Sequence, residues 1–536
     1  MTNYSTISAS SVPDASHIDD DMARRRRGHS PKRSSGGGDA STLSSIINLL
    51  NTIVGAGTLA MPAAMSHMSI MLGVVIILWS GLMSAFGLYL QSRCARYLDR
   101  GSASFFALSQ ITYPNAAVVF DGAIAIKCFG VGVSYLIIIG DLMPGVVLGF
   151  VGEASGITAK LPFLLDRHFW ITAFMLMIIP LAFLRRLDSL KYTSVIALVS
   201  IGYLIVLVVY HFASDSPSER GEVRLITWAG PVALLSSLPV VVFAYTCHQN
   251  MFSILNELKD NTPGSVVGVI SSSIGSAASI YILVAITGYL TFGSNVVGNI
   301  VSMYPANVAS TIGKAAIVIL VLFSVPLQIH PCRASLDAVL NWRPNKLAGS
   351  SGGSNGALLP RTNGAPTTAP ATDSHGAPVV TLSDMRFAVL TTLVIAGSYA
   401  TALSVTSLDR VLAYVGSTGS TSISFILPGL FYYKISDPDS VHHQRLMKED
   451  DDAGGLLAPQ GNGDEDAETE ANPDEASLRS GPASHLQTRG RRWRWRWDLE
   501  HLNEILLRKL SLCLAIYGIC VMIVCLTMNL FFVAAH

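Results

Sequence analysis

The sequence predicts an all-α, polytopic membrane protein with about 11 transmembrane helices, of which the first and the sixth are broken. Composition is one reason, because 50% of the 536 residues are hydrophobic, 13% are charged, and the mean hydropathy is +0.46. A soluble protein of this size is less apolar. The second reason is a series of apolar stretches near the roughly 20 residues that cross a bilayer. They are centred near residues 54, 80, 135, 176, 202, 243, 278, 319, 395, 422 and 521.

The first apolar stretch is interrupted by the segment NTIVGAGTLAMP, residues 51–62. Gly55 and Gly57 each disfavour a helix by about 1 kcal/mol relative to Ala, and a backbone group that they free in hydrocarbon needs a partner inside the protein. Asn51 and Thr52 lie beside them. A broken helix that lines a binding cavity explains these polar side chains. The alternative is close packing of a neighbouring helix on small residues, but packing alone requires no amide.

The sixth apolar stretch, from about Val232 to Leu255, repeats this pattern. We expect Pro239 to interrupt it first, and the polar run YTCHQN at residues 245–250 to interrupt it again. Five helices led by a broken helix, followed by five more led by a broken helix, are typical of a 5+5 inverted-repeat transporter with its site between the halves. The eleventh helix is then an accessory to a ten-helix core.

The formal net charge is zero, but the basic residues are concentrated on one side of the predicted spans. Arginine and lysine clusters precede the first span, follow the second, join the fourth to the fifth, follow the eighth and precede the eleventh. The positive-inside rule makes this side cytosolic. The amino terminus is then cytosolic, and an odd number of spans places the carboxyl terminus on the opposite, lumenal side. The first forty residues contain no apolar segment of a signal peptide.

These patterns divide the chain into membrane segments and polar segments. A basic-aromatic run before the last helix, Arg491–Trp497, favours contact with the lipid surface over a nucleic-acid partner. Low-complexity composition predicts flexible loops. The segments are a disordered cytosolic tail at 1–41, helices 1–6 at 42–255, helices 7–8 at 265–330, a flexible cytosolic loop at 331–382, helices 9–10 at 383–433, a cytosolic loop ending in the interfacial segment at 434–507, and helix 11 with a short lumenal end at 508–536.

We expect neither a cofactor nor a metal, and no enzymatic activity. The seven cysteines show no CxxC or Cys/His metal spacing. A polytopic enzyme acting on lipids would need a convergent set of a histidine with carboxylates, or a nucleophilic serine or cysteine, near the interface. His442 and His443 beside Asp437 and Asp439 are the nearest approach to such a set, and we interpret them as part of a solvated linker.

Four segments of the chain carry a family resemblance. They are NLLNTIVGAGTLAMPAAM, GVGVSYLIIIGDLMP at residues 130–144, FAYTCHQNMFSILNEL, and SVPLQIHPCRASL from Ser324. In sequence and order they resemble the amino acid/auxin permease family, and within it the fungal vacuolar amino acid transporters. The resemblance covers residues 42–255 and 265–433 and the last helix. It implies a LeuT-like fold, like that of the broken-helix sodium-coupled transporters.

The function that the resemblance implies is secondary active transport of amino acids across the vacuolar membrane by alternating access. Neutral or acidic amino acids would be exported to the cytosol, with protons as the coupling ion, as in the vacuolar members. Sodium coupling is one alternative. An amino acid sensor that signals through its cytosolic amino-terminal tail is another, and a sensor would bind ligand but move little of it. The amino acids carried and the oligomeric state stay open.

An amino acid presents a carboxylate and an ammonium, and both need partners in a dry site. The backbone NH groups of Gly55, Ala56 and Gly57 would begin a half-helix, and we expect them to hold the carboxylate. Glycine at these positions would let the substrate approach the backbone.

The ammonium is expected to meet exposed carbonyls of the two broken helices, those of Val54, Ala244 and Tyr245. Thr52 and Thr246 are predicted side-chain contacts of the substrate. The alternative for both threonines is a hydrogen bond to the backbone one helical turn earlier.

The coupling ion has two sets of candidate residues. In sodium-coupled relatives the positions that match Asn51 and Ser324 supply oxygen ligands, so the resemblance implies these two for sodium. A proton needs an ionisable group in or beside the membrane, where such groups are usually functional. The ionisable candidates are His248, Asp141, Lys127, Asp121 and His330. His248 titrates in the most useful range, and the alternative is a neutral histidine satisfied by carbonyls.

Overall fold

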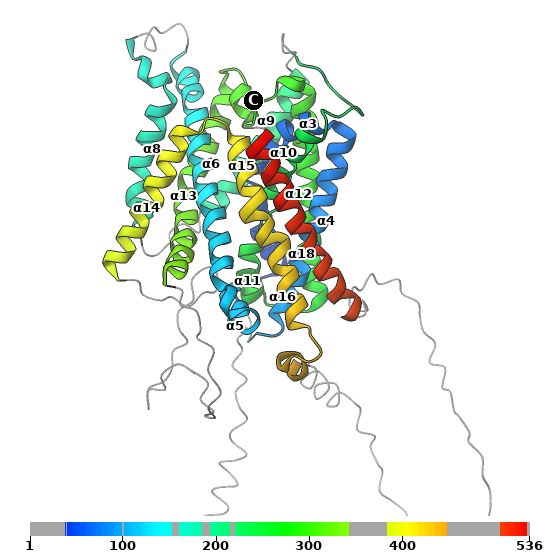
Figure 1. Ribbon diagram of the computed structural model, residues 1–536. Coiled ribbons are helices and arrows are strands. Elements are labelled where there is room, and N and C mark those ends of the chain that lie inside the picture. The colour runs from blue at the N-terminus through cyan, green and yellow to red at the C-terminus, as the bar shows by residue number, and fades with distance from the viewer. Residues whose placement is uncertain are drawn as a thin grey trace, which may run out of the picture.

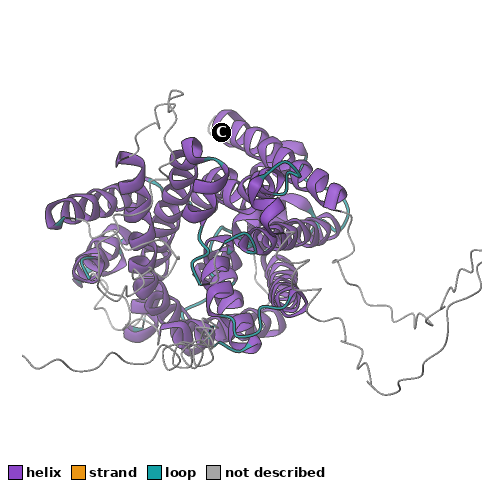
Figure 2. Ribbon diagram, turned by 90° about the horizontal axis from the view of Figure 1, so that it is seen from below, coloured by secondary structure: helices purple, strands orange, loops and turns teal. Residues whose placement is uncertain are grey.

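The computed structural model describes residues 38, 40–98, 101–152, 160–184, 193–214, 220–341, 383–446 and 504–532, and these residues are helical between short connections (Figure 1). Seen end-on, the helices pack side by side as a bundle (Figure 2). The α-helices are α2 (Thr42–Ile53), α3 (Ala56–Met68), α4 (Ile70–Ala95), α5 (Phe105–Thr112), α6 (Ala117–Val151), α8 (Arg167–Ala182), α9 (Thr193–Ser214), α10 (Pro231–Ala244), α11 (His248–Glu257), α12 (Pro263–Phe292), α13 (Val308–Asn341), α14 (Asp384–Ser404), α15 (Leu408–Val415), α16 (Leu427–Ile435) and α18 (Glu504–Thr527). The π-helical segments are η7 (Gly416–Ser420), η8 (Ser422–Ile426) and η10 (Met528–Phe532).

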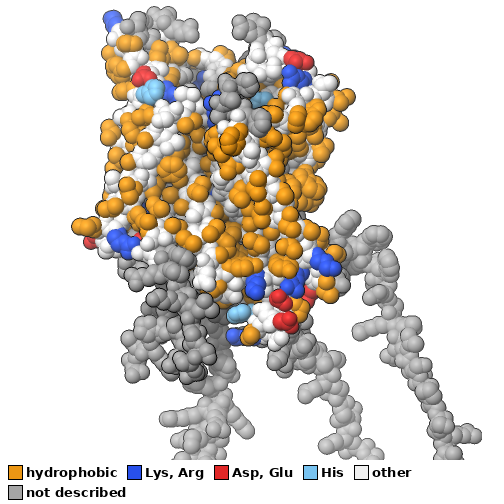
Figure 3. Space-filling view, viewed as in Figure 1, with side chains coloured by type: hydrophobic (Ala, Val, Ile, Leu, Met, Phe, Trp, Pro, Cys, Tyr) orange, Lys and Arg blue, Asp and Glu red, His pale blue; other side chains and the backbone are white. Residues whose placement is uncertain are grey.

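Most of these helices are built to cross a membrane. Within the described ranges, eight are long and apolar enough to do so, and the bent pair of α2 and α3 makes a further span. The helix α8 is shorter but apolar, and α15, η7, η8 and α16 follow one another in a single helical run. On the face shown in Figure 3, hydrophobic side chains are spread over the height of the bundle, and charged side chains lie near its two ends. The prediction of an all-α, multi-span membrane protein is confirmed.

Both predicted helix breaks are present. The first lies between the end of α2 at Ile53 and the start of α3 at Ala56, where the chain bends by 55°. The second lies between the end of α10 at Ala244 and the start of α11 at His248. Our expectation that Pro239 also interrupts this span was wrong, because it lies inside α10. A proline removes one helical hydrogen bond, and transmembrane helices accommodate that loss through their neighbours.

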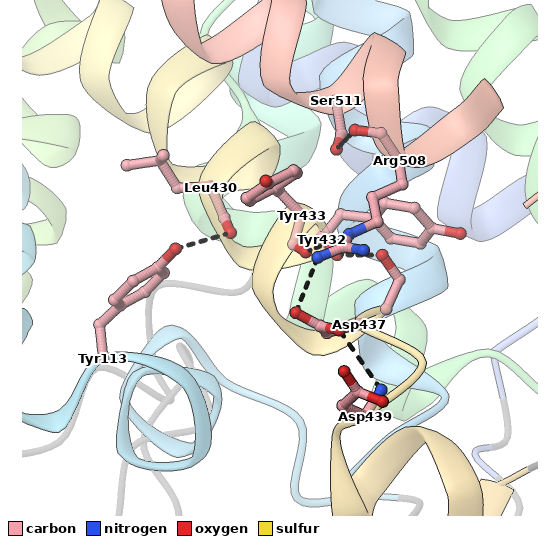
Figure 4. A network of polar contacts seen from close by, with 9 residues as sticks. Tyr113, Leu430, Tyr432, Tyr433, Asp437, Asp439, Arg508 and Ser511 are labelled. Carbon is pink, nitrogen blue, oxygen red and sulfur yellow. Dashed lines mark hydrogen bonds and ion pairs between the residues drawn. The ribbon is translucent and has the colours of Figure 1, made fainter. Parts of the chain in front are cut away.

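The last helix, α18, packs along α16 and is tied to it at the lower end of the bundle in Figure 1. Arg508 donates to Asp437 Oδ2 at 2.7 Å and to the Tyr433 carbonyl at 3.2 Å, and its guanidinium lies 4.7 Å from the centre of the Tyr433 ring. Nearby, the Tyr113 hydroxyl donates to the Leu430 carbonyl at 3.5 Å (Figure 4). These contacts fix the lower end of α16 from two sides.

The polar residues after α16 are part of this structure. His443 lies between two helices, with Nδ1 at 3.0 Å from the Tyr97 hydroxyl and Nε2 at 3.7 Å from Glu504. Burial raises the pKa of Tyr97, so its hydroxyl keeps its proton. Our interpretation of this histidine and of Asp437 as solvated linker was therefore wrong. The chain turns back onto the bundle here because α18 supplies charged partners.

Several predicted segments lie outside the described residues. They are most of the tail at 1–41, nearly all of the loop at 331–382 beyond Asn341, and residues 447–503 with the basic-aromatic run. At the edges of the membrane segments, α13 continues to Asn341 rather than to 330, and α18 begins at Glu504 rather than at 508.

Candidate functional site

The two helix breaks lie against each other. A Cβ atom added to Gly57 would be 2.7 Å from the Cβ and 2.9 Å from the Cα of Ala244, so this approach requires glycine. The Tyr281 hydroxyl of α12 lies 2.7 Å from the carbonyl of Ile53 and 2.7 Å from that of Ala244. Because a hydroxyl has a single proton, it donates to one of these carbonyls at a time. Tyr281 thus joins the end of α2 to the end of α10.

Gly55 is in a different environment from Gly57. A Cβ atom at Gly55 would meet no atom within 4 Å. Gly55 precedes α3, and the NH groups in the first turn of a helix have no acceptor inside the helix. Val54, by contrast, is buried, and its NH donates to the Leu50 carbonyl at 2.9 Å. Open space beside a helix amino end is therefore found at Gly55, whereas Gly57 serves the contact with Ala244.

The second break is held by side chains of α4. Ser84 donates to the Tyr245 carbonyl at 3.1 Å, and Gln91 donates to the His248 carbonyl at 2.9 Å. The carbonyls of Ala244 and Tyr245, which we expected to hold an ammonium, thus each have a hydroxyl at hydrogen-bonding distance. A carbonyl oxygen has two lone pairs, so each keeps one acceptor position.

Both predicted threonine contacts bond to the backbone one turn earlier, as in the alternative that we kept open. Thr52 and Thr246 each donate to the carbonyl four residues before them at 3.0 Å. Thr52 also accepts a hydrogen bond from Asn250 Nδ2 at 3.0 Å, which links α2 to α11. Thr246 accepts from the Ser424 hydroxyl of η8 at 3.4 Å. The threonines therefore connect the broken helices to their neighbours.

Several buried polar atoms beside the two breaks have no hydrogen-bond partner within the part of the chain that the structure describes. Such atoms are uncommon in native proteins, and each requires an explanation. They are Asn51 Oδ1 at the first break, and Tyr245 Oη, His248 Nδ1 and Gln249 Oε1 at the second. Convergent polar groups in mostly apolar surroundings are typical of a small-molecule site.

His248 is the ionisable candidate nearest to the breaks. Its side chain is 0% exposed, and Nε2 lies 3.2 Å from the Ser84 carbonyl. A Cβ atom added to Gly87 would be 2.8 Å from Nε2, so this glycine makes room for the ring. The histidine has one backbone carbonyl as its partner, and its tautomer decides which nitrogen donates.

The other coupling candidates do not meet His248. Ser324 donates to the carbonyl one turn earlier at 2.8 Å, and no hydrogen bond or ion pair among the described residues joins it to Asn51. Asp141 lies 3.4 Å from Arg167 Nε, and Arg167 also donates to the Val405 carbonyl at 3.1 Å. The carboxylate of Asp141 therefore belongs to a contact between α6, the start of α8 and the end of α14.

Comparison with known proteins identifies the family. Residues 38–450 match the family model described as transmembrane amino acid transporter protein. The chain belongs to this family of transmembrane amino acid transporters. The resemblance seen in four segments of the sequence is confirmed. The family is one of transporters rather than enzymes, as the sequence predicted.

Individual members of the family align with most of this chain. Vacuolar amino acid transporter 5 of Saccharomyces cerevisiae is 42% identical over 405 residues, which cover 73% of this chain and 88% of the relative. Vacuolar amino acid transporter 5 of Schizosaccharomyces pombe is 44% identical over 400 residues, which cover 74% and 86%. Sodium-coupled neutral amino acid transporter 7 of Bos taurus is 27% identical over 327 residues, which cover 60% and 69%.

Proposed function

We propose that this protein is a secondary active transporter of the vacuolar membrane that exports neutral or acidic amino acids to the cytosol, coupled to protons, by alternating access. The observation that carries the proposal is the pair of facing helix breaks with unpartnered polar atoms beside them. Relatives at 42% and 44% identity are named as vacuolar amino acid transporters, which supports the membrane and the substrate class. An amino-terminal tail in the cytosol and a lumenal carboxyl terminus complete the proposed topology.

The substrate carboxylate binds at the start of α3 in this proposal. The NH groups of Gly55, Ala56 and Gly57 begin that helix, and the positive end of its dipole favours an anion. The space beside Gly55 admits the carboxylate, since no protein atom lies within 4 Å of a Cβ position there. The substrate ammonium binds the carbonyl of Val54 and the remaining acceptor positions of Ala244 and Tyr245.

Proton coupling is assigned to His248, and Asp141 has a separate role at its ion pair with Arg167. His248 adjoins the second break, and its Nδ1 atom has no described partner. A change in its protonation would alter its contact with the Ser84 carbonyl, which belongs to α4. Proton binding would thereby be linked to the contact between α4 and the second break. Protonation of Asp141 would weaken the contact between α6 and α8.

Sodium coupling is the second candidate, because one observation favours it. Asn51 Oδ1 is a buried amide oxygen without a described partner, and hard cations bind such oxygens. Ser324 would supply a second oxygen, although its hydroxyl donates to a backbone carbonyl in the structure. The distant relative from Bos taurus is named as sodium-coupled.

Flux measurements with the purified protein in proteoliposomes test these assignments. A panel of amino acids is presented with an imposed pH gradient, in the presence and absence of sodium. We expect uptake that follows the pH gradient and is indifferent to sodium. Uptake that requires sodium and ignores the pH gradient would replace the proton by sodium. Saturable binding without flux under every gradient would refute the transporter and support a sensor.

A further inference from the structure

Lys127 in α6 is a buried basic residue that no described acidic side chain neutralises. Its side chain is 4% exposed, and its ammonium makes no hydrogen bond or ion pair with any residue in the described ranges. Two other basic residues, Lys314 and Arg333, are equally buried but have partners. Lys314 is 3% exposed and donates to the Tyr304 carbonyl at 2.7 Å. Arg333 is 4% exposed, donates to Thr391 Oγ1 at 2.9 Å and lies 3.9 Å from the centre of the Phe387 ring.

The surroundings of Lys127 connect it to the second helix break. A Cβ atom added to Gly419 of η7 would be 2.8 Å from the Lys127 Cβ, so the lysine lies directly on this π-helical segment. The same segment approaches α10, because a Cβ at Gly416 would overlap the Pro239 carbonyl oxygen. The Cys247 thiol, inside the break, is close enough to interact electrostatically with the ammonium. Lys127 therefore lies beside the wall of the proposed site, where π-helical segments are frequent.

An unbalanced charge in this position is costly unless a counter-charge joins it. Burial of a single ion in apolar surroundings is strongly unfavourable, and intramembrane cations are normally paired. The ionisable neighbours that interact with Lys127 are the thiols of Cys128 and Cys247, which are weak acids and poor counter-ions. A counter-charge for this ammonium therefore has to come from outside the residues that the structure describes.

We propose that Lys127 is an anion-binding residue of the transport path and that its occupant is the side-chain carboxylate of an acidic amino acid. The inference rests on the proposed function, since it gives that substrate one further contact. The α-carboxylate of the substrate is assigned to the start of α3, so the side-chain carboxylate is its remaining negative group. A neutral amino acid leaves Lys127 without a counter-charge, so the site prefers aspartate and glutamate over their amides.

The test compares each acidic amino acid with its amide, which has nearly the same shape. Uptake of aspartate and asparagine, and of glutamate and glutamine, is measured in proteoliposomes with the wild type, Lys127→Met and Lys127→Arg. We expect Lys127→Met to lower the acid-to-amide ratio of kcat/KM by about ten- to a hundred-fold, as expected for loss of a charge-assisted hydrogen bond. Lys127→Arg keeps the charge and should keep most of the preference. Lys314→Met is the matched control and should leave the ratio unchanged.

Several outcomes would overturn the inference while leaving the transporter intact. One is an unchanged acid-to-amide ratio in Lys127→Met with normal amide flux. Another is an equal loss of all substrates in Lys127→Met, which indicates a structural or coupling role. If replacement of chloride by gluconate slows wild-type amide flux but not that of Lys127→Met, the occupant is chloride and not a substrate carboxylate. Absence of flux for every amino acid in the wild type is a different result, since it refutes the proposed function itself.

A measurement on the wild type keeps the inference testable if the variants do not fold. Thermal unfolding of the purified protein is recorded with aspartate and with asparagine at equal concentrations. A ligand that binds the native state raises the melting temperature by an amount set by its affinity. We expect the larger rise with aspartate. An equal rise, or a larger rise with asparagine, would contradict the proposed contact.

Discussion

The two helix breaks are built from similar sequence but are held in place differently. At the second break the carbonyls of Tyr245 and His248 accept hydrogen bonds from Ser84 and Gln91 of α4. At the first break the Ile53 carbonyl is approached by the Tyr281 hydroxyl, and open space adjoins Gly55. Tyr281 of α12 contacts both breaks, but side chains of α4 hold only the second, whereas the first has room for a ligand. The difference teaches that one half of a paired site can be held in place by hydrogen bonds while the other half leaves space for the ligand.

The largest expected effect separates the two glycines of the first break. Gly57→Val should lower the free energy of unfolding by about 3 kcal/mol and abolish flux, because the side chain overlaps the backbone of Ala244. Gly55→Ala should leave thermal stability nearly unchanged, since its Cβ meets no atom, and should raise KM by crowding the ligand. Thermal unfolding and amino acid uptake check both variants. Equal destabilisation by the two substitutions would show that Gly55 does not face open space.

The next effect concerns the hydroxyl that joins the breaks. Tyr281→Phe keeps the ring, which lies edge-on to Tyr245 with centres 5.2 Å apart, but removes the group that contacts Ile53 and Ala244. We expect the free energy of unfolding to fall by about 1–2 kcal/mol, because buried carbonyls lose a donor. Tyr289→Phe is a control on the same helix, since that hydroxyl meets the segment near Glu222 instead. Flux in Tyr281→Phe equal to that of the control would argue against a role in the site.

A third effect tests the assignment of the proton to the second break. His248→Gln can still bond to the Ser84 carbonyl but cannot take up a proton. We expect net uptake to lose its response to the pH gradient, by roughly ten-fold or more, while exchange of labelled for unlabelled substrate continues. An unchanged pH response would leave His248 as a structural residue and would direct attention to Asp141.

The smallest effect lies outside the broken helices. Arg508→Gln removes the ion pair with Asp437, whose side chains are 26% and 31% exposed. Partly exposed ion pairs contribute little, so we expect a change below about 1 kcal/mol in thermal unfolding and normal flux. A large loss of flux would mean that α18 takes part in transport and is more than an accessory helix.

Much of the fold was predictable from local sequence. Apolar stretches of membrane-spanning length predicted the helices, because whether a segment crosses the membrane depends mainly on its own hydropathy. The two breaks were predictable because NTIVGAG and YTCHQN combine polar and helix-weakening residues inside such stretches. Pro239 was misjudged, since a proline within a packed transmembrane helix need not end it. The order of four segments sufficed to indicate the family, which the match over residues 38–450 confirms.

Partners across the chain were decided only by the tertiary structure. Tyr281 lies 228 positions from Ile53 and Arg167 lies 238 positions from Val405, and no local pattern predicts such pairs. The same holds for Lys127, because the residues around it in the sequence do not distinguish it from other lysines in long helices. Its lack of a described counter-charge becomes visible only when the neighbouring helices are in place. Sequence thus determined where the chain crosses the membrane and where its helices break, because both depend on local hydropathy and helix propensity. The tertiary structure decided which polar groups are satisfied, because that depends on long-range packing.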